Sequence, residues 1–315
     1  MTDEKDRGTG SLIPSAAAEI AARSTSLVRR GLNLLDAQKP TEDATFAQLR
    51  ERANAGEAEA QLYLGAAYFT GGSVPQDYLQ SVQWLRKAAE QGSADAQFHL
   101  GMAYAEGPGV PQDHVQAVQW FRKAAEQGYA HAQNSLGVCY ERGQGVPQDY
   151  AQAVVWYRKA AEQGAANAQH ELGWMYETGR GVPQDDAEAV AWYRKAAEQG
   201  FAVAQYNLGN MYRRGQGVSQ DYVQAVSWCR KAAEQGEADA MYNLGVMHST
   251  GQGVQRDHVE EHKWRNLAAS RASQENQKIF ADARDALAKK MTPQQLAEAQ
   301  RRAREWMEAF QRRKP

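Results

Sequence analysis

Six tryptophans recur every 36 residues, and this fixed period constrains the fold more than any other feature of the chain. They are Trp84, Trp120, Trp156, Trp192, Trp228 and Trp264, and the first five are each followed one residue later by RKAAEQG. Such a period is typical of a solenoid, in which each unit buries its apolar face only against its neighbours. Because that core grows with every unit, the length of 315 residues fits one elongated array.

Each repeat carries two helix patterns separated by a turn. In residues 93–128, the first half places apolar side chains such as Leu100 and Tyr104 at helical spacing. The segment GPGVPQD follows, with glycines for the turn, a proline that ends the helix, and Asp113 as a cap for the next one. The second pattern ends at Gly128. Each repeat is therefore predicted to be a helical hairpin.

Two further series set the register of the hairpins. An acid stands three residues before an amide or a second acid at the start of each second helix, which predicts a capping box. Glycine recurs in the middle of each first helix, and a small residue recurs in the second, which predicts close contact between the two. The capping acids are Asp77, Asp113, Asp149, Asp185, Asp221 and Asp257; the glycines are Gly65, Gly101, Gly137, Gly173, Gly209 and Gly245.

The combined pattern A-x-A-Q-x-x-L-G-x-x-Y-x-x-G-x-G-V-x-x-D-x-x-x-A-x-x-W-x-x-K-A-A-x-x-G resembles the Sel-one-like repeat (SLR) family, a relative of the tetratricopeptide (TPR) repeat. The resemblance spans residues 57–272 in six units. It implies an all-α, right-handed solenoid of helix-turn-helix repeats of 36 residues, whose first helices line a concave face for partner proteins. It also implies an adaptor role, often in bacteria. Some cysteine-rich members are associated with β-lactams, but this chain lacks their cysteine pair in each repeat.

The segments outside the repeats are predicted from their own patterns. Residues 1–43 form a disordered or loosely docked N-terminal segment with an amphipathic helix pattern from Ala16 to Leu35, and residues 44–56 form an N-terminal capping helix. Residues 273–315 are predicted to hold C-terminal capping helices with a basic tail, the last helix opening at Thr292.

The sixth repeat departs from its siblings at four positions. Gln255 replaces the usual proline, His248 replaces a tyrosine, and Glu261 and His262 replace an alanine and a valine. Terminal repeats often become polar where no neighbour covers them. We therefore interpret these four residues as the solvent-facing end of the array.

Charge and composition disfavour several classes of function. Counting along the chain, residues 44–270 carry 19 basic and 25 acidic side chains, and residues 271–315 carry 11 and 6. A mildly acidic array without a basic stripe is a poor nucleic-acid binder. Cys139 and Cys229 lie at different repeat positions and predict no disulfide, and both are expected to pack in the core. The N-terminus lacks an apolar signal region, so we expect a cytoplasmic protein.

One motif points to enzymatic chemistry. The sequence HVEEH, from His258 to His262, fits the inverted zinc-protease pattern, with two imidazoles one helical turn apart and Glu261 between them. The other repeats, however, carry Tyr78, His114, Tyr150, Asp186 and Tyr222 at the position of His258, and valine at the position of His262. We therefore favour drift over a zinc site, and we predict no enzyme activity and no cofactor. A metal-dependent hydrolase at this motif is kept as an alternative.

Comparison of the repeats with one another separates stacking positions from candidate binding positions. Fixed positions serve stacking, whereas positions that vary on the first helices are available for recognition. By resemblance to tetratricopeptide grooves, the varying residues line the concave face, and those of the fourth and fifth repeats include Trp, Tyr and Arg, the types enriched in binding hot spots. The candidate partner-binding residues are Phe98, Met102, Asn134, Glu141, His170, Trp174, Glu177, Tyr206, Asn210, Arg213, Arg214 and Tyr242.

The sequence thus predicts a non-catalytic scaffold or adaptor that binds a protein or peptide on its concave face. In a third hypothesis, the basic tail and the N-terminal amphipathic pattern recruit the array to an anionic membrane surface while the repeats hold cargo. The sequence itself names neither the partner nor the oligomeric state.

Overall fold

The computed structural model describes residues 42–71 and 74–313, and within them every regular element is an α-helix. The all-α solenoid prediction is confirmed: consecutive helix pairs follow one another at the predicted period. The stretch predicted to be disordered and the amphipathic pattern from Ala16 to Leu35 lie outside the described residues. The helices are α2 (Glu42–Asn54), α3 (Ala58–Thr70), α4 (Tyr78–Glu90), α5 (Ala94–Glu106), α6 (His114–Glu126), α7 (Ala130–Arg142), α8 (Tyr150–Glu162), α9 (Ala166–Thr178), α10 (Asp186–Glu198), α11 (Ala202–Arg214), α12 (Tyr222–Glu234), α13 (Ala238–Thr250), α14 (His258–Arg271), α15 (Gln274–Ala288) and α16 (Pro293–Arg313).

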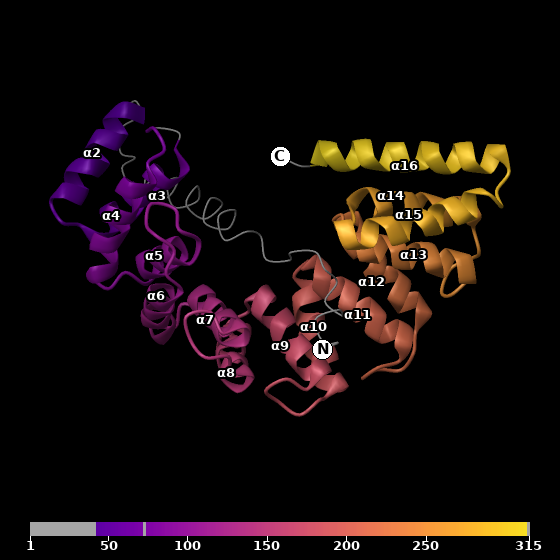
Figure 1. The fold of residues 1–315 in the computed structure, drawn as a ribbon, viewed down its shortest axis with the longest axis horizontal. Helices are drawn as coiled ribbons and strands as arrows, with labels where there is room; N and C mark the ends of the chain where they lie inside the picture. Colours follow the sequence, from indigo (N-terminus) through magenta and orange to yellow (C-terminus); the bar gives the residue numbers. More distant parts are fainter. Residues whose placement is uncertain (1–41, 72–73, 314–315) are drawn as a thin grey trace. The chain divides into compact units, whose positions relative to one another are not determined.

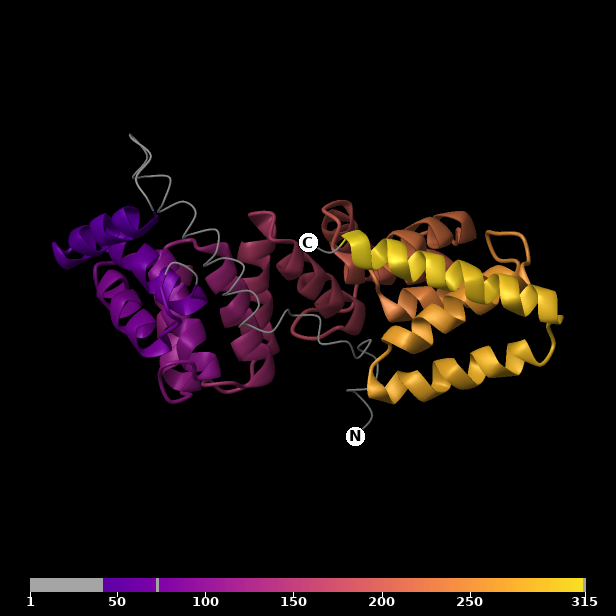
Figure 2. The ribbon, with the colours of Figure 1, turned by 90° about the horizontal axis from the view of Figure 1, so that it is seen from above.

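The described helices divide into two compact units, with the boundary in the sequence between Ala168 and Gln169 of α9. In the first unit, each helix from α2 to α7 packs against the one that follows it in the chain (Figure 1). In the second unit, α10 to α15 are packed in the same sequential way, and α16 lies along α14 (Figures 1 and 2). The predicted lone helix over 44–56 is α2, which covers α3 at the start of the array.

Aspartate begins every second helix, as the sequence predicts. At Asp149, for example, a carboxylate oxygen accepts a bond from the backbone N–H of Gln152 at 3.0 Å. The other half of the predicted capping box is wrong, because the Gln152 side chain does not return to the cap. The N–H of Asp149 instead donates to the backbone carbonyl of Tyr140 at 2.9 Å. The same backbone bond, from the capping aspartate to the preceding helix, recurs at all six capping positions.

Glycines in the first helices make room for the second helices, as predicted. A Cβ added at Gly137 would lie 2.6 Å from the ring of Tyr157, and one added at Gly173 would lie 2.8 Å from the ring of Tyr193. Both rings are fully buried, with 0% of their surface exposed. They stand one residue after a tryptophan of the ladder, so the residue beside each tryptophan, rather than the tryptophan itself, fills the space against the glycine.

Buried glutamines tie each repeat to the next. Gln205 donates its amide to the carbonyl of Ala197 at 3.0 Å and accepts a bond from Gln235 at 2.8 Å. The bond to Ala197 reaches the preceding repeat, whereas the amide-to-amide bond joins the two helices of one repeat; it recurs one repeat earlier in this unit and in three repeats of the first unit. The last repeat departs from this rule, because Met241 and Arg271 stand at the two glutamine positions.

The C-terminal helices α15 and α16 cover α14 and close this end of the array. Our interpretation of the polar residues in the sixth repeat is therefore wrong for three of the four, and only Gln255 is exposed. His248, Glu261 and His262 are buried, with 7%, 2% and 3% of their surfaces exposed. Glu261 pairs there with Arg265 at 2.8 Å. The helix opening at Thr292 is confirmed, since its hydroxyl and the Gln295 side chain bond each other's backbone N–H as a complete capping box.

Candidate functional site

The candidate residues of the fourth to sixth repeats all lie in the second unit, on α9, α11 and α13. We call the exposed side of these three helices the first-helix face. The helices run parallel and in register, since side chains about one repeat apart touch: His170 lies 3.1 Å from Asn207, and Asn210 lies 2.9 Å from Asn243. Residues at equivalent repeat positions therefore lie side by side along the face.

The His170 side chain lies beneath the first-helix face and is not part of its surface. Only 8% of its surface is exposed. Its ring packs against Tyr193 and Phe201, with centroids 5.6 and 5.5 Å apart. Its Nε2 atom meets the side-chain amide of Asn207. The imidazole is thus enclosed by aromatic rings and held by an amide.

Side-chain amides line the middle of the face. Asn243 donates to the Oδ1 atom of Asn210 at 2.9 Å. A second bond joins Asn210 to the Tyr206 hydroxyl, while burial, aided by the nearby Asp239 carboxylate, raises the pKa of Tyr206 to about 12. The phenol therefore stays neutral at physiological pH. Amides that donate and accept at once are suited to the alternating N–H and C=O groups of an extended peptide.

Aromatic and cationic side chains occupy the other end of the face. Trp174 is half-buried, and the Arg180 guanidinium lies 4.6 Å from its ring centroid. Arg213 is half-buried and Arg214 is exposed at the end of α11. Glu177 accepts a bond from the buried Tyr193 hydroxyl at 2.6 Å, which holds its carboxylate against α10. This end of the face therefore combines the flat apolar ring of Trp174 with three cationic side chains, which belong to Arg180, Arg213 and Arg214.

The candidate residues of the first unit lie deeper. Phe98 and Met102 are 1% and 6% exposed and pack in the core. Glu141 is buried, and its carboxylate accepts a bond from the Tyr157 hydroxyl at 2.6 Å. Asn134 is also buried. These four side chains are buried in the packing between helices, so they expose little surface to a partner.

Sequence comparison missed three residues of the face. Asn207, Asn243 and Arg180 make the contacts that hold His170, Asn210 and Trp174. The two asparagines belong to a repeat column that also varies, from Tyr63 in the first repeat to Asn243 in the sixth. That variation is the signal that would have found them. Arg180 lies in a turn, where the helical spacing gives no guide to its neighbours.

The HVEEH residues form ion pairs rather than a metal-binding cluster. The Nδ1 atom of His258 lies 3.0 Å from a carboxylate oxygen of Glu261, whose other oxygen pairs with Arg265. His262 lies buried on the same helix, and burial, with Arg284 nearby, lowers its pKa. Among residues 42–71 and 74–313, no group of three His, Cys, Asp or Glu side chains is placed to hold a metal ion.

The two cysteines pack as the sequence predicts. Cys139 and Cys229 are 7% and 0% exposed, and both are free thiols. Burial raises the pKa of each thiol to about 12, which disfavours the reactive thiolate. Across the described ranges, no helix combines the length and apolarity needed to cross a membrane.

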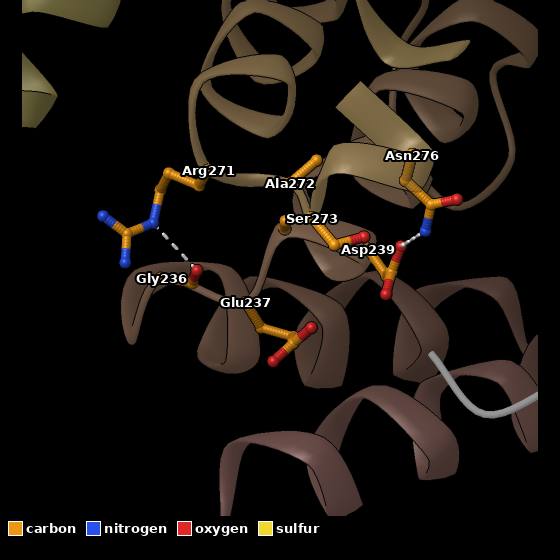
Figure 3. A pocket seen from close by; sticks show the side chains of 8 residues that line it. Gly236, Glu237, Asp239, Arg271, Ala272, Ser273 and Asn276 are labelled. Carbon is orange, nitrogen blue, oxygen red and sulfur yellow. Dashed lines mark hydrogen bonds between the residues drawn. The ribbon is translucent and has the colours of Figure 1, made fainter. Parts of the chain in front are cut away.

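A small cavity continues the first-helix face at the start of α13. It has a volume of about 110 Å³ and is lined by residues 236–239, residues 271–273 and Asn276 (Figure 3). Arg271 donates its Nε–H to the Gly236 carbonyl at 2.9 Å, and the Asn276 amide donates to Asp239 at 3.3 Å. The cavity thus places two carboxylates, of Glu237 and Asp239, beside one guanidinium.

The fold and this face define a tandem array of helical hairpins that presents the side chains of its first helices. The model of the Sel1 repeat matches residues 58–93, 94–129, 130–164, 166–201, 202–237 and 238–271. The chain belongs to the Sel1 repeat family. Among curated proteins, no sequence matches it.

Several solved structures are similar to this chain. A Sel1 repeat protein from Oxalobacter formigenes is 32% identical, with a TM-score of 0.68, over 80% of this chain and 97% of that one. The protective antigen c5321 of uropathogenic Escherichia coli, which displays an SLR fold, is 29% identical with a TM-score of 0.40, over 93% of this chain and 78% of its own. A putative Sel1 repeat protein from Klebsiella pneumoniae is 27% identical with a TM-score of 0.43, over 64% and 98%.

Proposed function

We propose that this protein is a non-catalytic scaffold that binds a protein or peptide partner on the first-helix face of its second unit. Sel1 repeat proteins are generally protein-interaction scaffolds, and this membership supports the class of function. The observation that carries the proposal is the half-buried Trp174 ring, with Arg180 stacked on it, beside a row of amides. Tryptophan and arginine are the side chains that most often dominate binding energy at protein interfaces.

The same face also offers backbone recognition. A peptide that lies across α9, α11 and α13 meets Trp174 as an apolar anchor and Asn210 and Asn243 as partners for its amide groups. The side chains beneath are already fixed by the contacts of His170 and Glu177. Little side-chain freedom is then lost on binding, which favours affinity.

The test compares the partners of the wild-type chain with those of the double variant Trp174→Ala, Arg180→Ala. We expect proteins captured from a cell lysate by the wild type to be lost from the variant, and a captured partner, once purified, to bind the variant about thirtyfold more weakly or worse. Trp228→Ala is the matched control, because this half-buried tryptophan lies on α12, outside the first-helix face, with Lys231 stacked on it. Equal affinity for both chains contradicts the proposal.

The two alternatives have weaker support. A metal-dependent hydrolase needs the HVEEH side chains to converge, whereas Glu261 is engaged by Arg265. Recruitment to a membrane surface rests on the basic C-terminal tail, whose Arg301 and Arg302 are paired with glutamates. A cytoplasmic location and the lack of a nucleic-acid partner stay predictions of the sequence.

A further inference from the structure

The cavity at the start of α13 is continuous with the first-helix face. Asp239 precedes Tyr242 by three residues and Asn243 by four, so the three side chains share one side of the helix. The Asp239 carboxylate also acts on the Tyr206 hydroxyl on α11. A volume of about 110 Å³ exceeds the roughly 10–15 Å³ needed for one water. The cavity therefore has room for the end of a side chain.

The charges inside the cavity are not balanced. Arg271 is held away from the carboxylates, since its Nε–H donates to Gly236 and its guanidinium lies 4.4 Å from the ring centroid of Phe310. In Figure 3 the guanidinium and the Glu237 carboxylate point away from each other. Asp239 has one amide partner, from Asn276, and Glu237 forms no ion pair with any described residue.

Both carboxylates bear the cost of burial, and the attraction of the nearby Arg271 guanidinium offsets it only in part for Glu237. Burial, and then repulsion from Asp239, raise the pKa of Glu237. Burial also raises the pKa of Asp239, against the effect of Asn276. Half-buried carboxylates of this kind gain most from a hydrogen-bonded cation, which satisfies the oxygens and offsets the lost hydration.

The two ends of the first-helix face carry opposite charge. Arg180, Arg213 and Arg214 lie at or beyond the C-terminal ends of α9 and α11, whereas Glu237 and Asp239 lie at the N-terminal end of α13. Because the three helices run parallel, the three arginines lie along one edge of the face, together with the Glu177 carboxylate that Tyr193 holds, whereas Glu237 and Asp239 lie along the other. An extended ligand that carries charges of its own therefore has one favourable orientation across the face, in which its cationic side chain lies at Glu237 and Asp239.

We propose that the partner segment on the first-helix face presents a lysine or arginine side chain to this cavity, where Glu237 and Asp239 receive its cation. This inference rests on the proposed function, because the face supplies the rest of the binding surface. Anionic ligands such as phosphate-bearing lipids or nucleic acids are disfavoured, since the same carboxylates repel them.

The test uses the full chain and a displayed library of short random peptides. Peptides selected by the wild type are expected to be enriched in Lys or Arg at one position. They should bind the double variant Glu237→Gln, Asp239→Asn about tenfold more weakly or worse, and Lys→Gln in the peptide should have the same effect. The matched control is Glu234→Gln, Glu275→Gln, which removes two exposed carboxylates outside the cavity and should leave binding unchanged.

Two outcomes separate this inference from the function on which it rests. If Trp174→Ala weakens the selected peptides, but they lack a basic position and bind the Glu237→Gln, Asp239→Asn variant as tightly as the wild type, the cavity assignment is wrong and the scaffold function stands. If no selected peptide responds to Trp174→Ala, both fail. The amide variants are isosteric, and an unchanged thermal midpoint excludes misfolding as the cause of weaker binding.

Discussion

His248 and His262 show how one position in a repeat can change its chemistry without leaving the core. The other repeats carry tyrosine and valine at these positions, and the two histidines are buried in their place. Burial lowers the pKa of both imidazoles. The described groups that act on them are Glu260, Arg230 and Asp257 for His248, and Arg284, Asp285, Arg265 and Glu261 for His262. Both side chains are therefore neutral in the folded chain near pH 7.

These histidines make the chain sensitive to mild acid. A folded-state pKa below the unfolded value of about 6.5 means that the unfolded chain binds protons first. Their effect on stability is therefore constant above that pH, and stability is lost as pH falls through 6.5 towards the folded pKa. We expect the thermal midpoint to fall between pH 7.5 and pH 5, and to fall less in His248→Tyr, His262→Val, which restores the repeat pattern. Parallel pH profiles for the two chains would contradict this.

At the scale of the element, the second helices begin in a way that combines side-chain and backbone bonds. The carboxylate of Asp149 caps α8, while its own N–H bonds to the carbonyl of Tyr140 in α7. The capping residue thus also fixes the angle at which one helix of the hairpin leaves the other. The Gln152 side chain, which the capping-box pattern singles out, is exposed and takes no part.

The two residues of this motif are predicted to differ sharply in importance. Asp149→Ala removes the acceptor for the first turn of α8 and should lower the free energy of unfolding by about 1 kcal/mol. Gln152→Ala should change it by less than about 0.5 kcal/mol, since alanine favours the helix and no bond is lost. Chemical denaturation of both variants measures the difference. Equal losses of unfolding free energy in the two variants would contradict this prediction, because they would mean that the Gln152 side chain also caps the helix.

At the scale of the whole molecule, an array needs its ends covered. At the C-terminal end, α16 places Trp306 over Trp264, with ring centroids 6.3 Å apart, and Phe310 against Arg271. Trp264 is consequently 2% exposed, although it belongs to the last repeat. The basic residues of the tail, which suggested an anionic target, serve in part to hold this helix, since Arg302 pairs with Glu260 of α14 at 2.8 Å.

Removal of residues 291–315 should therefore destabilise the second unit. The truncation uncovers Trp264 and the core around it, and loss of packing on a large aromatic side chain costs about 3 kcal/mol or more. We expect a lower thermal midpoint in calorimetry for the truncated chain. Arg304→Ala in the full chain is the control, because this arginine is exposed on α16, and it should leave the midpoint nearly unchanged. An unaltered midpoint after truncation would show that α16 is not a cap.

The sequence predicted the hairpins and their register because these depend on local chemistry. The aspartate caps and the glycine contacts between the two helices of a hairpin repeat six times, and each acts within one repeat, so the period reveals them. The complete capping box was predicted at both Asp149 and Thr292, because the two residues of the motif have the same spacing at both places. The prediction is correct at Thr292 and wrong at Asp149, where a carbonyl of the preceding helix takes the backbone N–H of the capping residue.

The sequence by itself determined an all-α array of six Sel1 repeats, and tertiary structure decided which varying residues are accessible. Phe98 and Tyr206 occupy the same repeat position, yet Phe98 is buried against the ring of Tyr129 whereas Tyr206 is only half-buried. Exposure at one position depends on the size of side chains one repeat away. Those contacts are not local, so the period that reveals the fold does not reveal the site.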